Sequence, residues 1–296
     1  MSMTSSQSIC SIVSLGEVLW DLFPDGNRFG GASANFACHA AMQGASVSML
    51  SAVGVDERGE EAIRILRHLG VDTSHVQRID NTATGTVGVT IDTSGRPSFI
   101  IHPDAAWDRV EWPPDFEPIL ARADAVYFGT LGQRCPLSQN TIRRALGIAK
   151  ANGVRRVLDV NLRAPYYDDA MVRESIALAN ILKLSDEEFP VVAKACGIDD
   201  LSKQEDALRS ILRHFELELV AMTRGANGAL LVTVDDTIDQ PGFPVVVCDT
   251  VGAGDAFTAA LTVGVCSSVL LRSVAENACK VASFACEYPG AIPTQP

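Results

Sequence analysis

A regular alternation of short apolar runs with longer amphipathic segments constrains the fold of this chain more than any other feature. The apolar, β-rich runs are at 10–16, 46–54, 124–129, 155–160, 180–185 and 218–223. Helical periodicity is found between them, at 33–44, 57–70, 138–153 and 203–215. Such runs favour buried strands, and strands that alternate with helices favour a parallel sheet covered by helices on both faces. The sequence therefore predicts an α/β fold.

The expected helices carry signals at their ends. Ser33 is expected to cap the start of the helix at 33–44, and Gly44 follows its end. Gly70 is expected to stop the helix at 57–70 in the same way.

Two regions interrupt the alternation. Residues 84–103 contain two β-rich runs around the turn sequence Asp-Thr-Ser-Gly-Arg-Pro, with no helix after them, which is typical of a hairpin. Residues 22–31 are also extended and rich in turn residues. We expect these pieces to form a small β-sheet apart from the main body, as a lid or an edge extension.

Charge and composition exclude several classes of function. The net charge is −12, whereas a general nucleic-acid binder needs a basic face that neutralises phosphates. No apolar run of about 20 residues is present, and the amino terminus lacks the features of an export signal. The eight cysteines form no Cys-x-x-Cys pair, which favours free thiols in a reducing compartment. We therefore expect a cytoplasmic protein that binds neither nucleic acid nor membranes.

The segment Cys-Asp-Thr-Val-Gly-Ala-Gly-Asp at 248–255 precedes small and apolar residues that predict a buried helix. A helix N-terminus exposes backbone N–H groups and the positive end of the helix dipole, and glycines let an anion approach them. Gly252, Ala253 and Gly254 are therefore a candidate anion site. The P-loop motif is absent, and so is the dinucleotide fingerprint, because Phe257 stands where its third glycine should be.

Asp255, directly after the two glycines, has two interpretations. Its carboxylate can cap the helix. It can also accept the proton of a hydroxyl that attacks the γ-phosphate of a nucleotide, while neighbouring N–H groups stabilise the transferring phosphoryl group. This segment alone leaves both open.

Two segments resemble the ribokinase-like sugar kinases, also called the phosphofructokinase-B family. Residues 249–261, Asp-Thr-Val-Gly-Ala-Gly-Asp-Ala-Phe-Thr-Ala-Ala-Leu, resemble the family's carboxyl-terminal motif. Residues 30–60 resemble its amino-terminal motif, a Gly-Gly pair followed by an asparagine on the next helix. The resemblance covers essentially the whole chain. It implies one ribokinase-like domain over 1–296, a three-layer αβα sandwich with a mainly parallel sheet, and a small β-lid from insertions at about 20–32 and 84–106.

This resemblance implies that ATP phosphorylates a sugar hydroxyl, with Asp255 as the general base. It assigns the anion hole to Gly252, Ala253 and Gly254, and sugar binding to Asp21, Gly30, Gly31, Asn35 and Asp255. Carboxylate and amide side chains suit paired contacts with neighbouring hydroxyl groups. For Asn35 the alternative is an amide on the helix surface.

The nucleotide and metal sites are also implied by the resemblance. Residues 182–189 resemble the family's Asn-x-x-Glu element, with Ser185 in place of the asparagine, and Glu188 is expected to organise Mg²⁺ through water. Asp249 and Val251 match part of a K⁺ site. A charged helix start at 182–189 and an ordinary hairpin at 223–229 are the alternatives. The residues expected to bind ATP are Lys183, Glu188, Thr223, Arg224, Gly225, Gly228, Gly252, Gly254 and Asn277.

Fructose is the expected substrate. Gly-Glu-Val-Leu-Trp-Asp at 16–21 and Asp-Val-Asn-Leu-Arg at 159–163 resemble the fructokinase branch of the family. Arg163 is expected near the sugar or the transferring phosphate, and its alternative is an ion pair with Asp159 or Asp168. Kinases for ribose, ketodeoxygluconate or adenosine and a non-catalytic sensor on the same fold stay open. The lid is expected to exclude water, in a monomer or in a homodimer joined through the lid.

Overall fold

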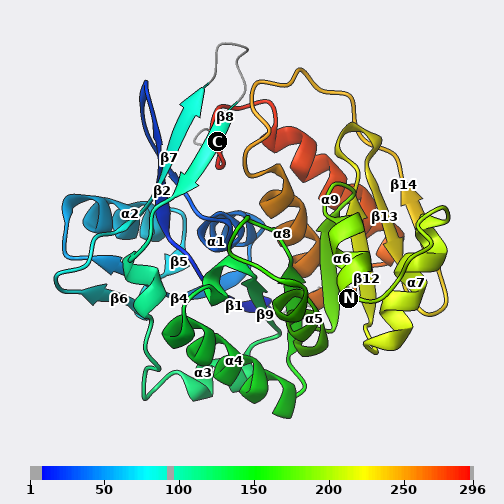
Figure 1. Cartoon of the computed structure of the whole chain (residues 1–296), viewed down its shortest axis with the longest axis horizontal. Helices are drawn as coiled ribbons and strands as arrows, with labels where there is room; N and C mark the ends of the chain where they lie inside the picture. The colour runs from blue at the N-terminus through cyan, green and yellow to red at the C-terminus, as the bar shows by residue number, and fades with distance from the viewer. Residues whose placement is uncertain (1–8, 92–96, 294–296) are drawn as a thin grey trace, which may run out of the picture.

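A large, mainly parallel sheet forms the centre of the molecule. The computed structural model describes residues 9–91 and 97–293 of the 296-residue chain. Within them the strand order is β14-β13-β12-β11-β10-β9-β1-β4-β5, with β6 beside β4 (Figure 1). The pairings from β12 to β5 are parallel, and β13 and β14 add an antiparallel edge. The strands are β1 (Ser11–Leu15), β4 (Ser46–Gly54), β5 (Val71–Asp72), β6 (Val76–Ile79), β9 (Ala125–Gly129), β10 (Arg155–Asp159), β11 (Ile181–Ser185), β12 (Leu219–Thr223), β13 (Ala229–Val232) and β14 (Thr237–Gln240).

Helices cover both faces of this sheet (Figure 1). One face carries α1 (Ala32–Met42), α2 (Glu57–His68), α8 (Ala253–Cys266) and α9 (Leu271–Ala285), and the other carries α3 (Glu117–Arg122), α4 (Pro136–Ala151), α5 (Asp169–Leu178), α6 (Phe189–Ala195) and α7 (Gln204–His214). Two hydrophobic cores result, and in β1 Ile12 belongs to one and Val13 to the other. A strand buried on both faces is apolar at nearly every position, which explains the continuous apolar runs. The predicted α/β fold is confirmed.

A second, smaller sheet has the order β3-β2-β7-β8 and begins just after the carboxyl end of β1 (Figure 1). Its strands are β2 (Leu19–Phe23), β3 (Gly26–Gly30), β7 (Gly85–Ile91) and β8 (Pro97–Ile101). β2 and β3 form one antiparallel pair, β7 and β8 form another, and β2 joins β7 in parallel. The predicted small sheet is confirmed, although the hairpin connection at 92–96 lies outside the described residues.

Contacts with the body anchor the base of the small sheet. The Tyr166 hydroxyl donates to the carbonyl of Ile101 at 2.9 Å. Arg134 donates to the carbonyl of His102 at 2.9 Å and forms a buried ion pair with Asp108 at 2.6 Å. These bonds hold the end of β8 against the connections of the large sheet.

The predicted helix start is wrong in one detail. The capping residue of α1 is Gly31, whose φ of 102° suits glycine, and not Ser33. The Ser33 hydroxyl lies 3.1 Å from the Leu15 carbonyl and 3.2 Å from Oε2 of Glu17, so it ties α1 to the end of β1. The glycines predicted after α1 and α2 both have positive φ, as expected for helix ends.

All eight cysteines are free thiols, and three of them are packed in the interior. Cys10, Cys38 and Cys279 are buried, while Cys248 is exposed. Buried free thiols behave as small apolar groups. None of the helices in the described ranges combines the length and the apolar character needed to cross a membrane.

Candidate active site

The start of α8 is built around Gly252. This residue caps the helix with a left-handed φ of 79°. A Cβ placed there would lie 2.4 Å from the Ala291 carbonyl oxygen, so a larger residue would displace one of the two segments. The first N–H groups of a helix have no intrahelical partner, and those of Gly254 and Asp255 belong to this first turn. An anion fits such a helix start.

Asp255 does not cap α8. Its carboxylate accepts a hydrogen bond of 2.8 Å from Nδ2 of Asn35, which lies on α1, 220 residues earlier. Helices α1 and α8 pack side by side (Figure 1). The capping interpretation is therefore wrong, and Asp255 joins Asn35 in one buried polar group.

The pKa of Asp255 is raised to about 7, mainly by burial and also by the negative charge of Asp159. The hydrogen bond from Asn35 and the positive charges of Lys183 and Arg163 oppose this shift. A carboxyl with a pKa near neutrality is both available as an anion and basic enough to take a proton, which suits a general base.

Gly30 and Gly31 lie where the small sheet meets α1. A Cβ on Gly30 would lie 2.8 Å from Oδ2 of Asp21, and one on Gly31 would lie 2.7 Å from the Glu17 carbonyl oxygen. The glycine pair therefore allows Asp21 of β2 to approach the start of α1 closely. Burial raises the pKa of Asp21 to about 6.

Arg163 is exposed in the loop after β10. Its positive charge opposes the rise in the pKa of both Asp21 and Asp255, so it lies within electrostatic reach of both carboxyls. In the described part of the chain it forms no ion pair with Asp159 or Asp168, since the former binds a lysine and the latter caps α5. The guanidinium is therefore available to a ligand.

Two buried polar atoms near Asp255 have no hydrogen-bond partner among the residues the structure describes. They are Oδ1 of Asn35 and the hydroxyl of Tyr127, whose ring stacks on Phe36 at 3.9 Å between centroids. Buried polar groups are nearly always satisfied, so a ligand hydroxyl or a water molecule fits here. The sequence marked Tyr127 only as part of an apolar strand, because its surroundings in the chain are those of a core residue.

Glu17 is a further buried carboxyl that sequence reasoning did not assign. Its carboxylate lies 3.4 Å from the backbone nitrogen of Ser33 and 3.2 Å from the Ser33 hydroxyl oxygen. Burial raises its pKa. Glu17 thus fixes the start of α1. The Gly-Glu pair at 16–17 is the sequence pattern that could have pointed to this residue.

Lys183 and Glu188 come from β11 and the turn after it. The Lys183 ammonium forms a buried ion pair with Asp159 at 3.0 Å. The Glu188 carboxylate accepts backbone N–H bonds from Leu162 at 2.7 Å and from Ser185 at 2.8 Å. Glu188 therefore holds the loop after β10 against the end of β11, and it is more than a solvated charge at a helix start.

The turn between β12 and β13 contains Thr223, Arg224, Gly225 and Gly228. Gly228 has a φ of 85°, and a Cβ there would lie 2.0 Å from a carbonyl oxygen of β14, so the turn requires glycine. Arg224 forms an ion pair with Asp239 of β14. The Arg224 guanidinium is thus already bound to a carboxylate beside the turn.

Asp249 precedes α8 and already has several partners. Its carboxylate accepts N–H bonds from Val251 and Gly290, both at 3.0 Å. The guanidinium of Arg28, on β3 of the small sheet, lies 3.8 Å from the same carboxylate. Asn277, which the sequence predicts to bind ATP, is exposed on α9.

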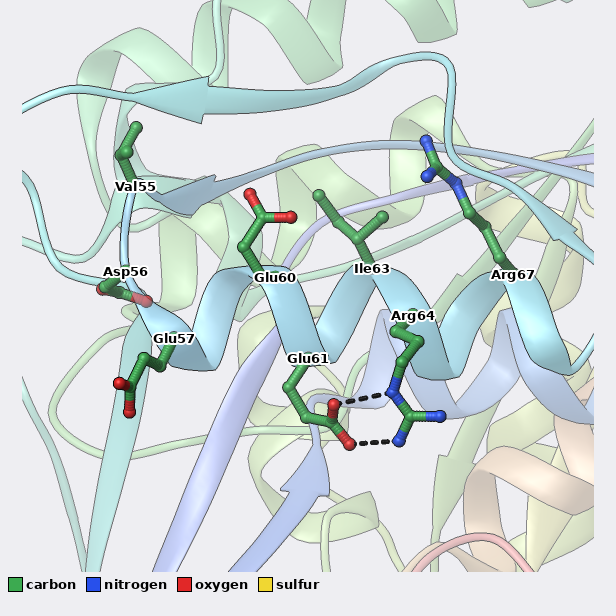
Figure 2. Close-up of a pocket in the computed structure, with 8 residues that line it drawn as sticks. All are labelled: Val55, Asp56, Glu57, Glu60, Glu61, Ile63, Arg64 and Arg67. Carbon is green, nitrogen blue, oxygen red and sulfur yellow. Dashed lines mark hydrogen bonds and ion pairs between the residues drawn. The ribbon is translucent and has the colours of Figure 1, made fainter.

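A surface hollow of about 670 Å³ follows the outer side of α2 (Figure 2). Figure 2 shows that Glu61 and Arg64 in its lining pair with each other, at 2.5 and 2.7 Å. Asp56 in the same lining caps α2 by accepting the N–H of Gly59. None of the predicted site residues lines this hollow, so we assign the candidate site to the start of α8 instead.

A buried carboxyl with a pKa near 7 lies at the N-terminus of α8, beside an amide oxygen without a partner among the described residues, and this arrangement suits the transfer of a phosphoryl group to a hydroxyl. Residues 21–296 match the model of the pfkB family of carbohydrate kinases, and the chain belongs to this family. The predicted family is confirmed, and the protein is a carbohydrate kinase.

Known proteins resemble the chain over most of its length. A putative sugar kinase of Pyrococcus horikoshii is 31% identical over 271 residues, covering 86% of this chain and 82% of that protein. Its crystal structure in complex with ATP aligns with a TM-score of 0.80 at 30% identity, over 95% of this chain and 93% of that one. A fructokinase of Salmonella typhimurium is 29% identical over 259 residues, covering 83% of this chain and 81% of that protein. The ribokinase-like fold is confirmed by these likenesses.

Proposed function

We propose that this carbohydrate kinase transfers the γ-phosphoryl group of ATP to a hydroxyl of fructose. The contact between Asp255 and Asn35 at the start of α8 carries the proposal, because it joins a base to a hydroxyl-binding amide. The Pyrococcus relative whose structure contains ATP supports the donor. The Salmonella fructokinase supports the acceptor, together with the motifs at 16–21 and 159–163.

In this mechanism the sugar lies between α1 and the small sheet. Asn35 and Asp21 bind its hydroxyl groups, and Asp255 removes the proton of the attacking one. The sugar oxygen then bonds to the γ-phosphorus while the bond to the β-phosphate oxygen breaks and ADP leaves. The N–H groups of Gly254 and Asp255 and the Arg163 guanidinium stabilise the charge on the phosphoryl oxygens. The small sheet acts as a lid that excludes water.

Magnesium fits the nucleotide side, and potassium fits less well. Each carboxylate oxygen of Glu188 accepts one backbone N–H, which leaves lone pairs for a water of the Mg²⁺ shell. Bound Mg²⁺ would neutralise phosphate charge. At Asp249 the Arg28 guanidinium already supplies a positive charge at 3.8 Å. We therefore propose that a K⁺ ion at Asp249 and Val251 binds only where Arg28 moves away.

The substrate assignment is tested by ADP release with MgATP across fructose, ribose, ketodeoxygluconate, adenosine, tagatose and fructose phosphates. Turnover on fructose far above the others is the expected result. Turnover on another compound of the panel would leave the proposed phosphoryl transfer in place and would show that fructose is not the preferred acceptor. If no compound of the panel is turned over but calorimetry shows that ATP and a sugar still bind, a non-catalytic sensor on the same fold would be favoured.

The pH dependence of kcat/KM is expected to follow Asp255. Because the base must be ionised, kcat/KM should fall about tenfold for each pH unit below a midpoint near pH 7, where the pKa lies. The measurement is initial rate against pH at saturating MgATP, with circular dichroism at each pH to confirm folding. A profile that is flat down to pH 5 would remove Asp255 as the base.

Asn35→Ala is expected to raise the KM for the sugar about tenfold, since a hydrogen bond to a polar ligand is lost and Asp255 loses its donor. The effect on kcat should be smaller. Isothermal titration with the sugar measures the affinity directly. Asn152→Ala, at the exposed end of α4, is the control. An unchanged sugar affinity in Asn35→Ala would take Asn35 out of the site.

A further inference from the structure

A buried ion pair lies beneath the first turns of α8. Asp159 ends β10, Lys183 lies on β11, and the two are paired in register, so their side chains share one side of the sheet. The Lys183 Nζ lies 3.1 Å from Oδ1 and 3.0 Å from Oδ2 of Asp159. Asp159 is fully buried, and Lys183 is 5% exposed. The pair is therefore part of the interior and not of a solvated surface.

Both members of this pair also reach α8. The Thr258 hydroxyl oxygen lies 3.0 Å from Oδ2 of Asp159 and 2.8 Å from the Gly254 carbonyl oxygen. A Cβ on Gly254 would lie 3.1 Å from the Lys183 Nζ, so the ammonium lies against the turn that contains the anion site. Asp255 is the next residue in this turn.

Stability does not account for such a pair. Removing two charges from water is costly, and well-packed apolar residues at a buried pair are often as stable or more so. Lys183 stays charged here, because the negative charges of Asp159, Glu188 and Asp255 outweigh its burial and raise its pKa. The pair thus places one fixed positive and one fixed negative charge beside the proposed base.

We propose that Asp159 and Lys183 are positioning residues that set, from below α8, how readily Asp255 takes up a proton. Asp159 increases this tendency and Lys183 decreases it, while Thr258 fixes the helix turn over the pair. The inference rests on the proposed function, because it concerns the same base. It goes beyond that function by giving the two members of one ion pair opposite effects.

Other charged or titratable groups lie near Asp255 or near the ion pair, and none of them is changed in the test. Arg163 after β10 and Tyr127 on β9 interact with Asp255, Glu188 after β11 interacts with Lys183, and Glu17 after β1 interacts with Tyr127. Among the carboxylates of this group, only Asp159 forms an ion pair with a lysine in the described part of the chain. Substituting either partner therefore changes one charge and leaves these four in place.

The test is titration of the Asp255 carboxyl by ¹³C NMR in ligand-free protein, with the signal assigned from Asp255→Asn. Because this readout needs no turnover, it stays meaningful even where the proposed function fails. Asp159→Asn should lower the titration midpoint and Lys183→Met should raise it, each by about one pH unit, the lower end of what a nearby charge does. The double substitution should lie between the two. In active protein, the acid limb of kcat/KM should move in the same directions.

Two variants separate positioning from support of the fold. Lys183→Arg keeps the charge and should return the midpoint toward that of the unchanged protein. Lys194→Met removes a lysine whose ion pair with Asp169 is exposed, and should leave the midpoint unchanged. A merely structural pair would lower the melting temperature in both single variants and leave the midpoint in place. That result, or shifts of the same sign, would overturn the proposal. Where Asp159→Asn does not fold, the comparison of Lys183→Met with Lys183→Arg decides alone.

Discussion

Asp255→Asn is expected to lower kcat about 10³-fold while the sugar still binds, since general base catalysis contributes roughly 10²–10⁴-fold. Asparagine keeps the shape of the side chain but cannot accept the proton of the attacking hydroxyl. The N–H groups of the α8 start remain, so a residual rate above the uncatalysed one should persist. Single-turnover kinetics and sugar titration measure the two effects separately.

The same substitution is also expected to change the thermal stability of the protein. Burial raises the pKa of Asp255 to about 7, so above pH 7 the folded protein holds a buried anion that the unfolded chain would hold in water. The fold loses stability as pH rises from the unfolded pKa to the folded one, because over this range the unfolded chain releases the proton that the folded protein still holds. Asp255→Asn should therefore melt at the same or a higher temperature at pH 8. Asp206→Asn, an exposed carboxylate on α7, is the control for both measurements. Near-normal turnover in Asp255→Asn would refute the assignment of the base.

Gly252→Ala is expected to lower kcat about 10²-fold, the effect of losing one well-placed donor to the transferring group. A Cβ at Gly252 would lie 2.4 Å from the Ala291 carbonyl oxygen and 2.6 Å from its Cα, so the helix start must shift. The N–H groups of the first turn would then no longer converge on the phosphoryl oxygens. Sugar binding, which we propose depends on α1 and the small sheet, should change little.

Gly153→Ala is the matched control for this substitution. Gly153 also has a left-handed φ, of 70°, but nothing lies within 4 Å of the added Cβ. It therefore shares the backbone strain of Gly252→Ala without the collision. Equal loss of kcat in the two variants would show that general destabilisation, and not the geometry of the anion site, explains the result.

The sequence allowed most of the fold to be predicted because its signals were local. The predicted strand at 46–54 coincides with β4, since a β-rich run lies between the helix-ending Gly44 and the helix-capping Asp56. The start of α1 was predicted wrongly because Ser33 has the chemistry of a capping residue. Its partners, Leu15 and Glu17, lie on a neighbouring strand end and compete successfully for the hydroxyl. Tertiary contacts of this kind leave no local pattern.

The candidate site could be predicted where its residues form a motif. The glycines and Asp255 were found because they are contiguous, and Asn35 because it follows a glycine pair. The pair of Asp159 and Lys183 was missed, since its members lie 24 residues apart and become neighbours only through the register of β10 and β11. Neither strand alone indicates a charged partner.

The bond between Asn35 and Asp255 has a consequence for the order in which the molecule assembles. It spans 220 residues, and the contact of His39 with the Ala291 carbonyl spans 252. Contacts of such high sequence separation close late in folding and make it slow. During synthesis the amino-terminal half leaves the ribosome without the helix that completes its centre. We therefore expect no phosphotransfer by a growing chain before α8 has been made and packed against α1, which separates the onset of catalysis from the onset of folding.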